Sequence, residues 1–188
     1  KPAMKVLCAV PFRDKTITEL DVSSQSLGAE GVLVISRYLE NNGALTSLNI
    51  SNNGLGQLAP PAGWKAIPKY SDGSGTKYKH DDGREQDNMP TGAKPEGIIA
   101  IANAIPTMGA LVEFDISANT ICAEGGRLLA AALKDNQIMT ELNIANNDLG
   151  KDSDAWNAKA DMSGVMAISN AIPTMGAMKK LNISSNYL

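Results

Sequence analysis

The stretch L-T-S-L-N-I-S-N-N-G-L-G, residues 45–56, decides the fold of this chain of 188 residues. Its pattern is L-x-x-L-x-L-x-x-N-x-L, with four apolar positions and one asparagine. The pattern returns four more times, so the chain is built on an internal repeat. The other copies begin at Ile17, Leu111, Met139 and Met178.

The copies share one basic interval. A 28-residue step leads from Ile17 to Leu45, and the same step leads from Leu111 to Met139. The step from the second copy to the third is longer by the length of segment 57–94. The step from the fourth copy to the fifth is longer by the length of segment 151–161. The chain therefore keeps one 28-residue unit and carries two insertions, residues 57–94 and 151–161.

Each unit begins with a predicted strand. Leu48 and Ile50 alternate with Asn49, which is the period-two pattern of a strand with one buried side. An amide side chain follows each strand at one fixed position. We expect it to bond backbone groups of the turn in its own and adjacent layers, which is a structural role. These residues are Gln25, Asn53, Asn119, Asn147 and Asn186.

Behind each of the first four strands the sequence predicts a helix. Apolar residues recur there four positions apart, beside small residues, and this spacing gives one apolar stripe that faces the strands. Pro106 and Pro173 are expected to end two of these helices, because proline lacks the amide donor. The two apolar columns are Ile35, Ile101, Leu129 and Ile168, and Leu39, Ile105, Leu133 and Ile172.

A strand plus a helix in every unit closes one coil of a horseshoe-shaped solenoid. The chain resembles the leucine-rich repeat family, specifically its ribonuclease-inhibitor-like class with 28-residue units. By repeat type it is similar to Ran GTPase-activating proteins and to the repeat domains of NOD-like receptors. The resemblance covers residues 17–56, 95–150 and 162–188. It implies an α/β fold, a right-handed β-α solenoid with a parallel concave sheet and outer helices.

We expect a single leucine-rich repeat domain over residues 1–188. Residues 1–16 are interpreted as an N-terminal cap or a preceding helix, because the end layer of a solenoid must be shielded from water. Both insertions leave at the turn from strand to helix, so we expect them on the same edge. In the larger one a β-hairpin is predicted near residues 64–80.

Composition limits the function classes. The net charge of −3 argues against a nucleic-acid-binding protein, which normally carries a basic patch. No apolar run reaches the roughly 18 residues of a membrane span, so no membrane association is predicted. Cys8 and Cys122 show no metal-binding spacing and are interpreted as buried thiols of a reducing, cytoplasmic compartment.

No catalytic or cofactor-binding constellation is present in the sequence. His80 is the only histidine and is interpreted as a solvated residue in a loop. The segment 72–77 lacks the spacing of a phosphate-binding loop. Asp152, Asp154 and Asp161 lack the spacing of a calcium-binding EF-hand. We therefore predict a protein that is not an enzyme and uses no cofactor or metal.

Two sets of residues are candidates for binding a partner. Aromatic residues of the insertions either pin their own loops to the scaffold or form a binding surface, since Trp and Tyr are enriched in binding hot spots. Outward strand positions form a mildly acidic face, which is either simply solvated or steers a basic partner. The candidates are Trp64, Tyr70, Tyr78 and Trp156 in the insertions, and Glu19, Asp21, Glu113, Asp115 and Glu141 on the strands.

The sequence therefore predicts a non-enzymatic scaffold for a protein partner. Two alternatives stay open: a GTPase-activating-type regulator of a small GTPase, and a sensing repeat segment of a larger receptor. The last copy ends at Leu188 without a helix behind it. An uncapped last layer would allow self-association.

Overall fold

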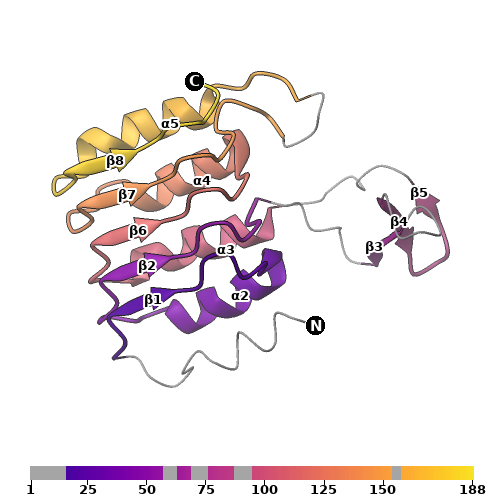
Figure 1. The fold of residues 1–188 in the computed structure, drawn as a ribbon, viewed down its shortest axis with the longest axis horizontal. Coiled ribbons are helices and arrows are strands. Elements are labelled where there is room, and N and C mark those ends of the chain that lie inside the picture. The colour runs from indigo at the N-terminus through magenta and orange to yellow at the C-terminus, as the bar shows by residue number, and fades with distance from the viewer. Residues whose placement is uncertain (1–15, 57–62, 69–75, 87–94, 154–157) are drawn as a thin grey trace. The chain divides into compact units, whose positions relative to one another are not determined.

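The computed structural model describes residues 16–56, 63–68, 76–86, 95–153 and 158–188 (Figure 1). The chain divides into two compact units. Unit 1 comprises Lys1–Gln57 and Glu96–Leu188, and unit 2 comprises Leu58–Pro95. The first insertion of the repeat thus forms a unit of its own. The cap predicted for residues 1–16 falls almost entirely outside the described residues.

Unit 1 contains a parallel sheet of five strands in the order β1-β2-β6-β7-β8. Each strand is short and comes from one copy of the repeat, and equivalent positions pair in register. Leu48 of one strand, for example, is paired with Phe114 of the next. The strands are β1 (Glu19–Asp21), β2 (Ser47–Asn49), β6 (Glu113–Asp115), β7 (Glu141–Asn143) and β8 (Lys180–Asn182).

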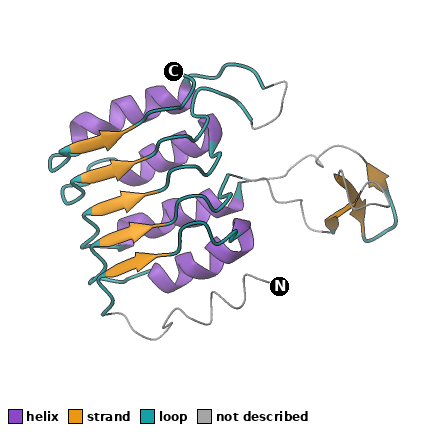
Figure 2. Ribbon diagram, in the orientation of Figure 1, coloured by secondary structure: helices purple, strands orange, loops and turns teal. Residues whose placement is uncertain are grey.

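The helices described in unit 1 lie side by side along one face of the sheet (Figure 2). They are α2 (Gly28–Leu39), α3 (Glu96–Ala104), α4 (Cys122–Leu133) and α5 (Ser163–Ala171). After α3 and α5 the chain tightens into the 3₁₀ turns η1 (Ile105–Thr107) and η2 (Ile172–Thr174). Pro106 and Pro173 lie in these turns, so the predicted ends of the two helices are confirmed. A parallel sheet with helices on one face is compatible with a β-α solenoid.

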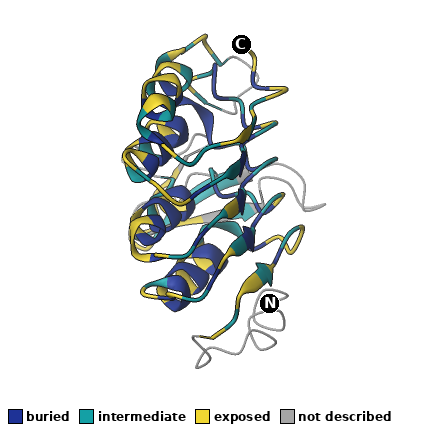
Figure 3. Ribbon diagram, turned by 90° about the vertical axis from the view of Figure 1, so that its left-hand side faces the viewer, coloured by how far each residue is buried: buried dark blue, intermediate teal, exposed yellow. Residues whose placement is uncertain are grey.

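The core fills the space between sheet and helices. The central residues of the inner strands are Leu48, Phe114 and Leu142, and each is at most 2% exposed. Leu20 and Leu181, on the two edge strands, are only half-buried. Buried positions recur in every layer (Figure 3). Burial thus accumulates by stacking, since each layer covers the apolar side chains of its neighbours.

Buried asparagines connect the layers. Asn119 is fully buried, and its Oδ1 accepts hydrogen bonds from the backbone N–H of Asn53 (2.8 Å) and Leu55 (3.3 Å) in the preceding layer. Its Nδ2 donates to three backbone carbonyls, including Ile50 of the preceding layer (3.1 Å) and Ile116 of its own (2.9 Å). The structural role predicted for this position is confirmed for Asn119, and Asn53, Asn147 and Asn186 repeat it. Gln25 of the first layer departs from it, because this residue is exposed and its amide donates to the Ser23 carbonyl oxygen of its own turn (3.1 Å).

Alternate layers differ in how their helices end. Asn41 follows α2 with φ of 60°, and its N–H donates to the Thr107 hydroxyl of the next layer (3.1 Å). Asp135 follows α4 with φ of 62°, and its N–H donates to the Thr174 hydroxyl (2.9 Å). The threonine of each Ile-Pro-Thr segment therefore bonds the chain where the preceding helix has ended. These two bonds join the layers in pairs where the helices end. The sequence did not reveal this role of the threonines.

The first insertion leaves the layer around it intact. In an uninterrupted layer Gly31 N–H donates to the Leu27 carbonyl oxygen (3.0 Å). In the interrupted layer the bond is displaced by one residue: Ile98, which follows the equivalent glycine, donates its N–H to the Leu55 carbonyl oxygen (3.2 Å), although the whole insertion lies between the two residues in the sequence. The start of α3 is therefore held directly against the end of its own strand segment.

Excision of residues 57–94, with Gly56 joined to Pro95, is expected to leave unit 1 folded. The junction would read Leu-Gly-Pro-Glu-Gly, which matches Leu-Gly-Ala-Glu-Gly at residues 27–31. Because closure entropy depends weakly on loop length, the free energy of unfolding of unit 1 should change by no more than about 2 kcal/mol. Urea unfolding followed by circular dichroism checks this. Excision of 57–96 breaks the register and should destabilise the protein. Equal stabilities for the two deletions would contradict the expectation.

The second insertion has an ordered stem. Lys151 forms a β-bridge with Ala160, and Asp161 N–H donates to the Gly150 carbonyl oxygen (2.9 Å). The Asp152 carboxylate accepts a hydrogen bond from Lys159 N–H (2.9 Å). The ammonium of Lys151 lies 3.3 Å from the centroid of the Tyr187 ring, a cation–π contact with the last layer. The insertion is therefore tied to its own layer and to the last layer.

Unit 2 is an antiparallel sheet of three strands, β3 (Trp64–Pro68), β4 (Thr76–His80) and β5 (Glu85–Gln86). The hairpin predicted at residues 64–80 is confirmed by the pairing of β3 with β4. The third strand, β5, was not predicted. It follows a turn at Gly83, whose φ of 94° favours glycine. The dipeptide Asp82-Gly83 is a hairpin signal that could have revealed it.

Candidate protein-binding face

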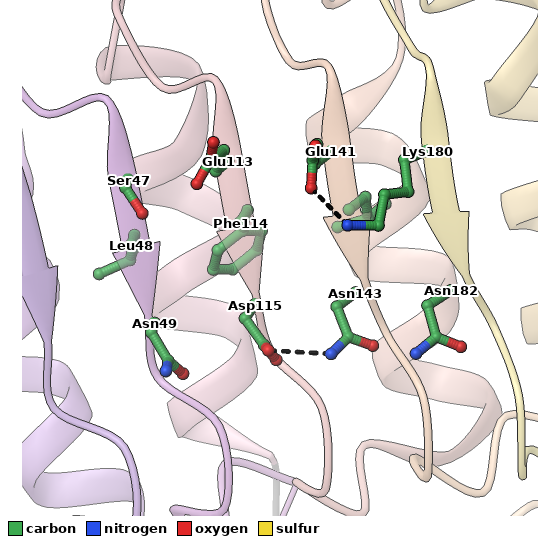
Figure 4. A pocket seen from close by; sticks show the side chains of 11 residues that line it. Ser47, Leu48, Asn49, Glu113, Phe114, Asp115, Glu141, Asn143, Lys180 and Asn182 are labelled. Carbon is green, nitrogen blue, oxygen red and sulfur yellow. Dashed lines mark hydrogen bonds and ion pairs between the residues drawn. The ribbon is translucent and has the colours of Figure 1, made fainter.

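The outward side chains of the five parallel strands form what we call the sheet face. A hollow of about 370 Å³ lies on it, lined by residues of β2, β6, β7 and β8 (Figure 4). The strands place two outward residues in each layer, so the face has two rows. The first row is Glu19, Ser47, Glu113, Glu141 and Lys180, and the second is Asp21, Asn49, Asp115, Asn143 and Asn182.

The carboxylates of the second row are engaged within the protein. Asp115 accepts a hydrogen bond from the Asn143 amide (2.9 Å) and others from the N–H (2.9 Å) and hydroxyl (2.7 Å) of Ser117. Asp21 accepts bonds from Ser23 N–H (2.9 Å) and from the Asn49 amide (3.2 Å). The pKa of Asp21 is lowered, mainly because Ser23 N–H donates to its carboxylate. Both aspartates therefore hold the turn after their strand.

The first row carries the exposed charge of the hollow. Glu113 and Glu141 occupy paired positions on neighbouring strands, and Lys180 is paired with Glu141 on the other side. The Lys180 ammonium lies 2.9 Å from Glu141 Oε2 (Figure 4). The pKa of Lys180 is raised, first by this hydrogen bond and then by the charges of Glu141 and Glu113.

The structure brings together only part of the acidic candidate set. Glu113, Asp115 and Glu141 line the hollow, whereas Glu19 and Asp21, on the edge strand β1, do not. The ion pair of Lys180 with Glu141 was not predicted from the sequence. The signal was available, because subtracting the second insertion aligns Lys180 with Glu141. Whether any of these residues binds a partner stays a prediction.

The aromatic candidates belong to the insertions. Trp64 lies on β3 and the half-buried Tyr78 on β4, both in unit 2. Tyr70 and Trp156 lie outside the described residues. The structure therefore leaves both interpretations of the aromatic residues open, and a role in partner binding stays a prediction.

The loop position predicted for His80 is wrong, because the residue ends strand β4. Its Nδ1 lies 2.9 Å from Asp82 Oδ1, and its side chain is 24% exposed. The pairing of Trp64 with His80 across the hairpin holds this position in the sheet. The hairpin predicted near residues 64–80 already had His80 at its end, so the two sequence predictions disagreed and the hairpin prediction is the correct one.

The acidic residues of the second insertion are used in local bonds. Asp161 Oδ1 accepts a hydrogen bond from Ser163 N–H (2.9 Å), and its other oxygen lies 3.5 Å from the Arg127 guanidinium. Asp152 bonds Lys159, as described above, and Asp154 lies outside the described residues. Within the part of the chain that the structure describes, no cluster of three or more His, Cys, Asp or Glu residues could hold a metal ion. No helix of that part is both long and apolar enough to cross a membrane.

Comparisons with known proteins bear on the fold. Residues 44–65 match the family model described as Leucine Rich Repeat. The solved structure titled Leiomodin-1 Actin-Binding Site 2 (ABS2) is similar to the chain, with a TM-score of 0.57. These findings support a leucine-rich repeat protein. The sequence identity to that structure is 17%, over 97% of this chain and 76% of the other, so the likeness shows the fold alone. A comparison with curated proteins found no match.

Proposed function

We propose that this leucine-rich repeat protein is a non-enzymatic scaffold whose sheet face binds a basic segment of a protein partner. One observation carries the proposal. Glu113 and Glu141 stand on neighbouring strands within one hollow, and their backbones pair in register. Like charges on neighbouring strands repel each other, and because the ion pair of Lys180 is with Glu141, repulsion remains at Glu113. A cation placed beside both carboxylates would remove that repulsion.

The exposure of the two glutamates suits recognition by charge. Glu113 is exposed and Glu141 is half-buried, so both carboxylates keep much of their hydration in the free protein. Complementary charges of this kind speed association and select partners more than they raise affinity. A basic partner segment that also bonds the amides of the second row would add contacts in a fixed geometry.

The comparisons support the broader part of this proposal. The similar solved structure is named as an actin-binding site, so a leucine-rich repeat fold of this kind serves protein recognition in that protein. The identity of 17% gives no reason to transfer actin itself to this chain. No finding supports the GTPase-activating alternative.

Four finer features are part of the proposal. They are the ribonuclease-inhibitor-like class, a right-handed coil, additional partner contacts from Trp64, Tyr70, Tyr78 and Trp156, and a reducing cytoplasmic location. The 28-residue interval supports the class, and the general preference of parallel β-α-β connections for right-handed crossovers supports the coil. The buried thiol of Cys122 supports the location. Self-association through the last layer stays a prediction.

Fluorescence anisotropy with labelled octa-arginine tests the binding proposal. Octa-arginine should bind the natural protein at low salt, and the double substitution Glu113→Gln, Glu141→Gln should weaken binding about fivefold, which corresponds to about 1 kcal/mol for exposed ion pairs. The matched control, Glu30→Gln with Glu96→Gln, removes the same charge from the first turns of α2 and α3. It should weaken binding much less. Equal losses for the two double variants would contradict a site on the sheet face.

Substitution of Glu113 alone gives a second measurement, and a purely structural role of this residue would give the opposite result. Glu113→Gln alone removes a like-charge pair and should raise the free energy of unfolding by roughly 0.2–1 kcal/mol while it weakens binding. Urea unfolding of the single variant measures this. A loss of stability together with a loss of binding would assign Glu113 to the fold instead.

A further inference from the structure

The last layer breaks the charge pattern of the sheet face. At the first-row position the earlier layers carry Glu19, Ser47, Glu113 and Glu141, whereas the fifth carries Lys180. The side chain of Lys180 reaches back to the preceding strand, where its ammonium bonds Glu141. It also lines the hollow that contains Glu113. The chain thus supplies one cation of its own at the acidic end of the hollow.

The contact between Lys180 and Glu141 is exposed and easily broken. The side chains are 72% and 44% exposed, so water competes for both charged groups. Ion pairs at such exposure contribute little to stability, and their median is about 0–1 kcal/mol. Lys180 lies on the edge strand β8, where no described strand covers its other side. The side chain can therefore move into solvent without disturbing the core.

We propose that Lys180 is an internal competitor that occupies Glu141 until a basic side chain of the partner displaces it. The inference rests on the proposed function, because it assigns the same hollow to a basic ligand. Lys180 shows that the hollow accepts an ammonium group held by Glu141 of β7, and a guanidinium group carries the same charge. A tethered competitor has a high effective concentration and lowers the affinity of every cationic ligand. Ligands that carry several basic groups suffer least, since they can also engage Glu113.

Neutralising two neighbouring lysines in separate variants distinguishes competition by Lys180 from a general change in the electrostatic field of the surface. Lys180→Gln removes the competitor, whereas Lys179→Gln removes the same charge from an exposed residue that does not line the hollow. With labelled octa-arginine as probe, Lys180→Gln should tighten binding about threefold, and Lys179→Gln should change it much less. In the Glu141→Gln background the gain from Lys180→Gln should disappear, because nothing is left for Lys180 to occupy. Circular dichroism and thermal unfolding verify that each variant is folded.

The outcomes distinguish the two levels of the proposal. If Lys180→Gln and Lys179→Gln change binding equally, or if the gain persists without Glu141, the competitor role is overturned. The scaffold proposal would then still hold, provided that Glu113→Gln with Glu141→Gln weakens binding more than its control. If octa-arginine binds none of the folded variants, the binding proposal falls and the competitor role falls with it.

Discussion

Replacing Asn119 by alanine is expected to destabilise the protein by at least about 3 kcal/mol, because buried polar groups left without partners each cost about 1–3 kcal/mol. The substitution removes the acceptor of Asn53 N–H and Leu55 N–H and the donor to three backbone carbonyls. Residue 119 is fully buried, so water cannot easily take over these bonds. Urea unfolding followed by circular dichroism measures the loss.

The control for this prediction is Asn103→Ala. Asn103 is exposed on α3, and alanine is a better helix former there, so the free energy of unfolding should change by less than about 0.5 kcal/mol. Asn147→Ala, one layer further along, should reproduce the large loss, since Asn147 makes the same kinds of bonds. Comparable small effects at positions 103, 119 and 147 would contradict the description of these asparagines as the link between layers.

Replacing Gly56 by alanine is expected to cost about 3 kcal/mol or more, the upper range for overpacked sites. A Cβ atom at this position would overlap the carbonyl oxygen of Thr120 and lie 2.6 Å from the Cα of Ile121. Both are backbone atoms of the next layer, and Gly56 N–H donates to the Asn119 carbonyl oxygen (3.0 Å). The two layers would have to separate. A thermal unfolding scan should show the midpoint falling by several degrees.

The matched glycine is Gly43, where an added Cβ atom would meet no other atom within 4 Å. Gly43→Ala should leave stability unchanged or raise it by about 0.4–1 kcal/mol, because alanine reduces the freedom of the unfolded chain. Gly150 repeats the environment of Gly56 at the second insertion, where a Cβ would overlap the carbonyl oxygen of Tyr187. If alanine were tolerated at both Gly56 and Gly150, the close approach of the layers at the insertion sites would be wrong.

Most of the fold of unit 1 was predictable because the same sequence pattern recurs from layer to layer. The strand of Leu48 and Ile50, the buried asparagine and the helix columns occur once per layer, so chance matches are excluded by repetition. The positions of both insertions followed from the interval alone. The handedness of the coil did not follow from the residues, since strand, helix and interval are the same for either sense, and it stays a prediction.

What the sequence did not reveal arises from contacts that occur once or that join separate segments. Strand β5 is too short to show a period. The threonine of Ile-Pro-Thr bonds a residue of the preceding layer, which no local pattern encodes. The pair of Lys180 with Glu141 is visible only after the second insertion has been removed from the register. The structural use of Asp21 and Asp115 was hidden for another reason, because an outward carboxylate gives the same sequence pattern whether or not it bonds its own turn.

Binding of a basic segment by the sheet face can be mapped residue by residue in the amide NMR spectrum of the protein during titration with octa-arginine. The shifted amides should cluster on β2, β6, β7 and β8 and be largest around Glu113, Glu141 and Lys180. Glu113→Gln with Glu141→Gln should strongly reduce these shifts. Shifts confined to the helices or to the strands of unit 2, or no saturable shifts at all, would contradict binding at the sheet face.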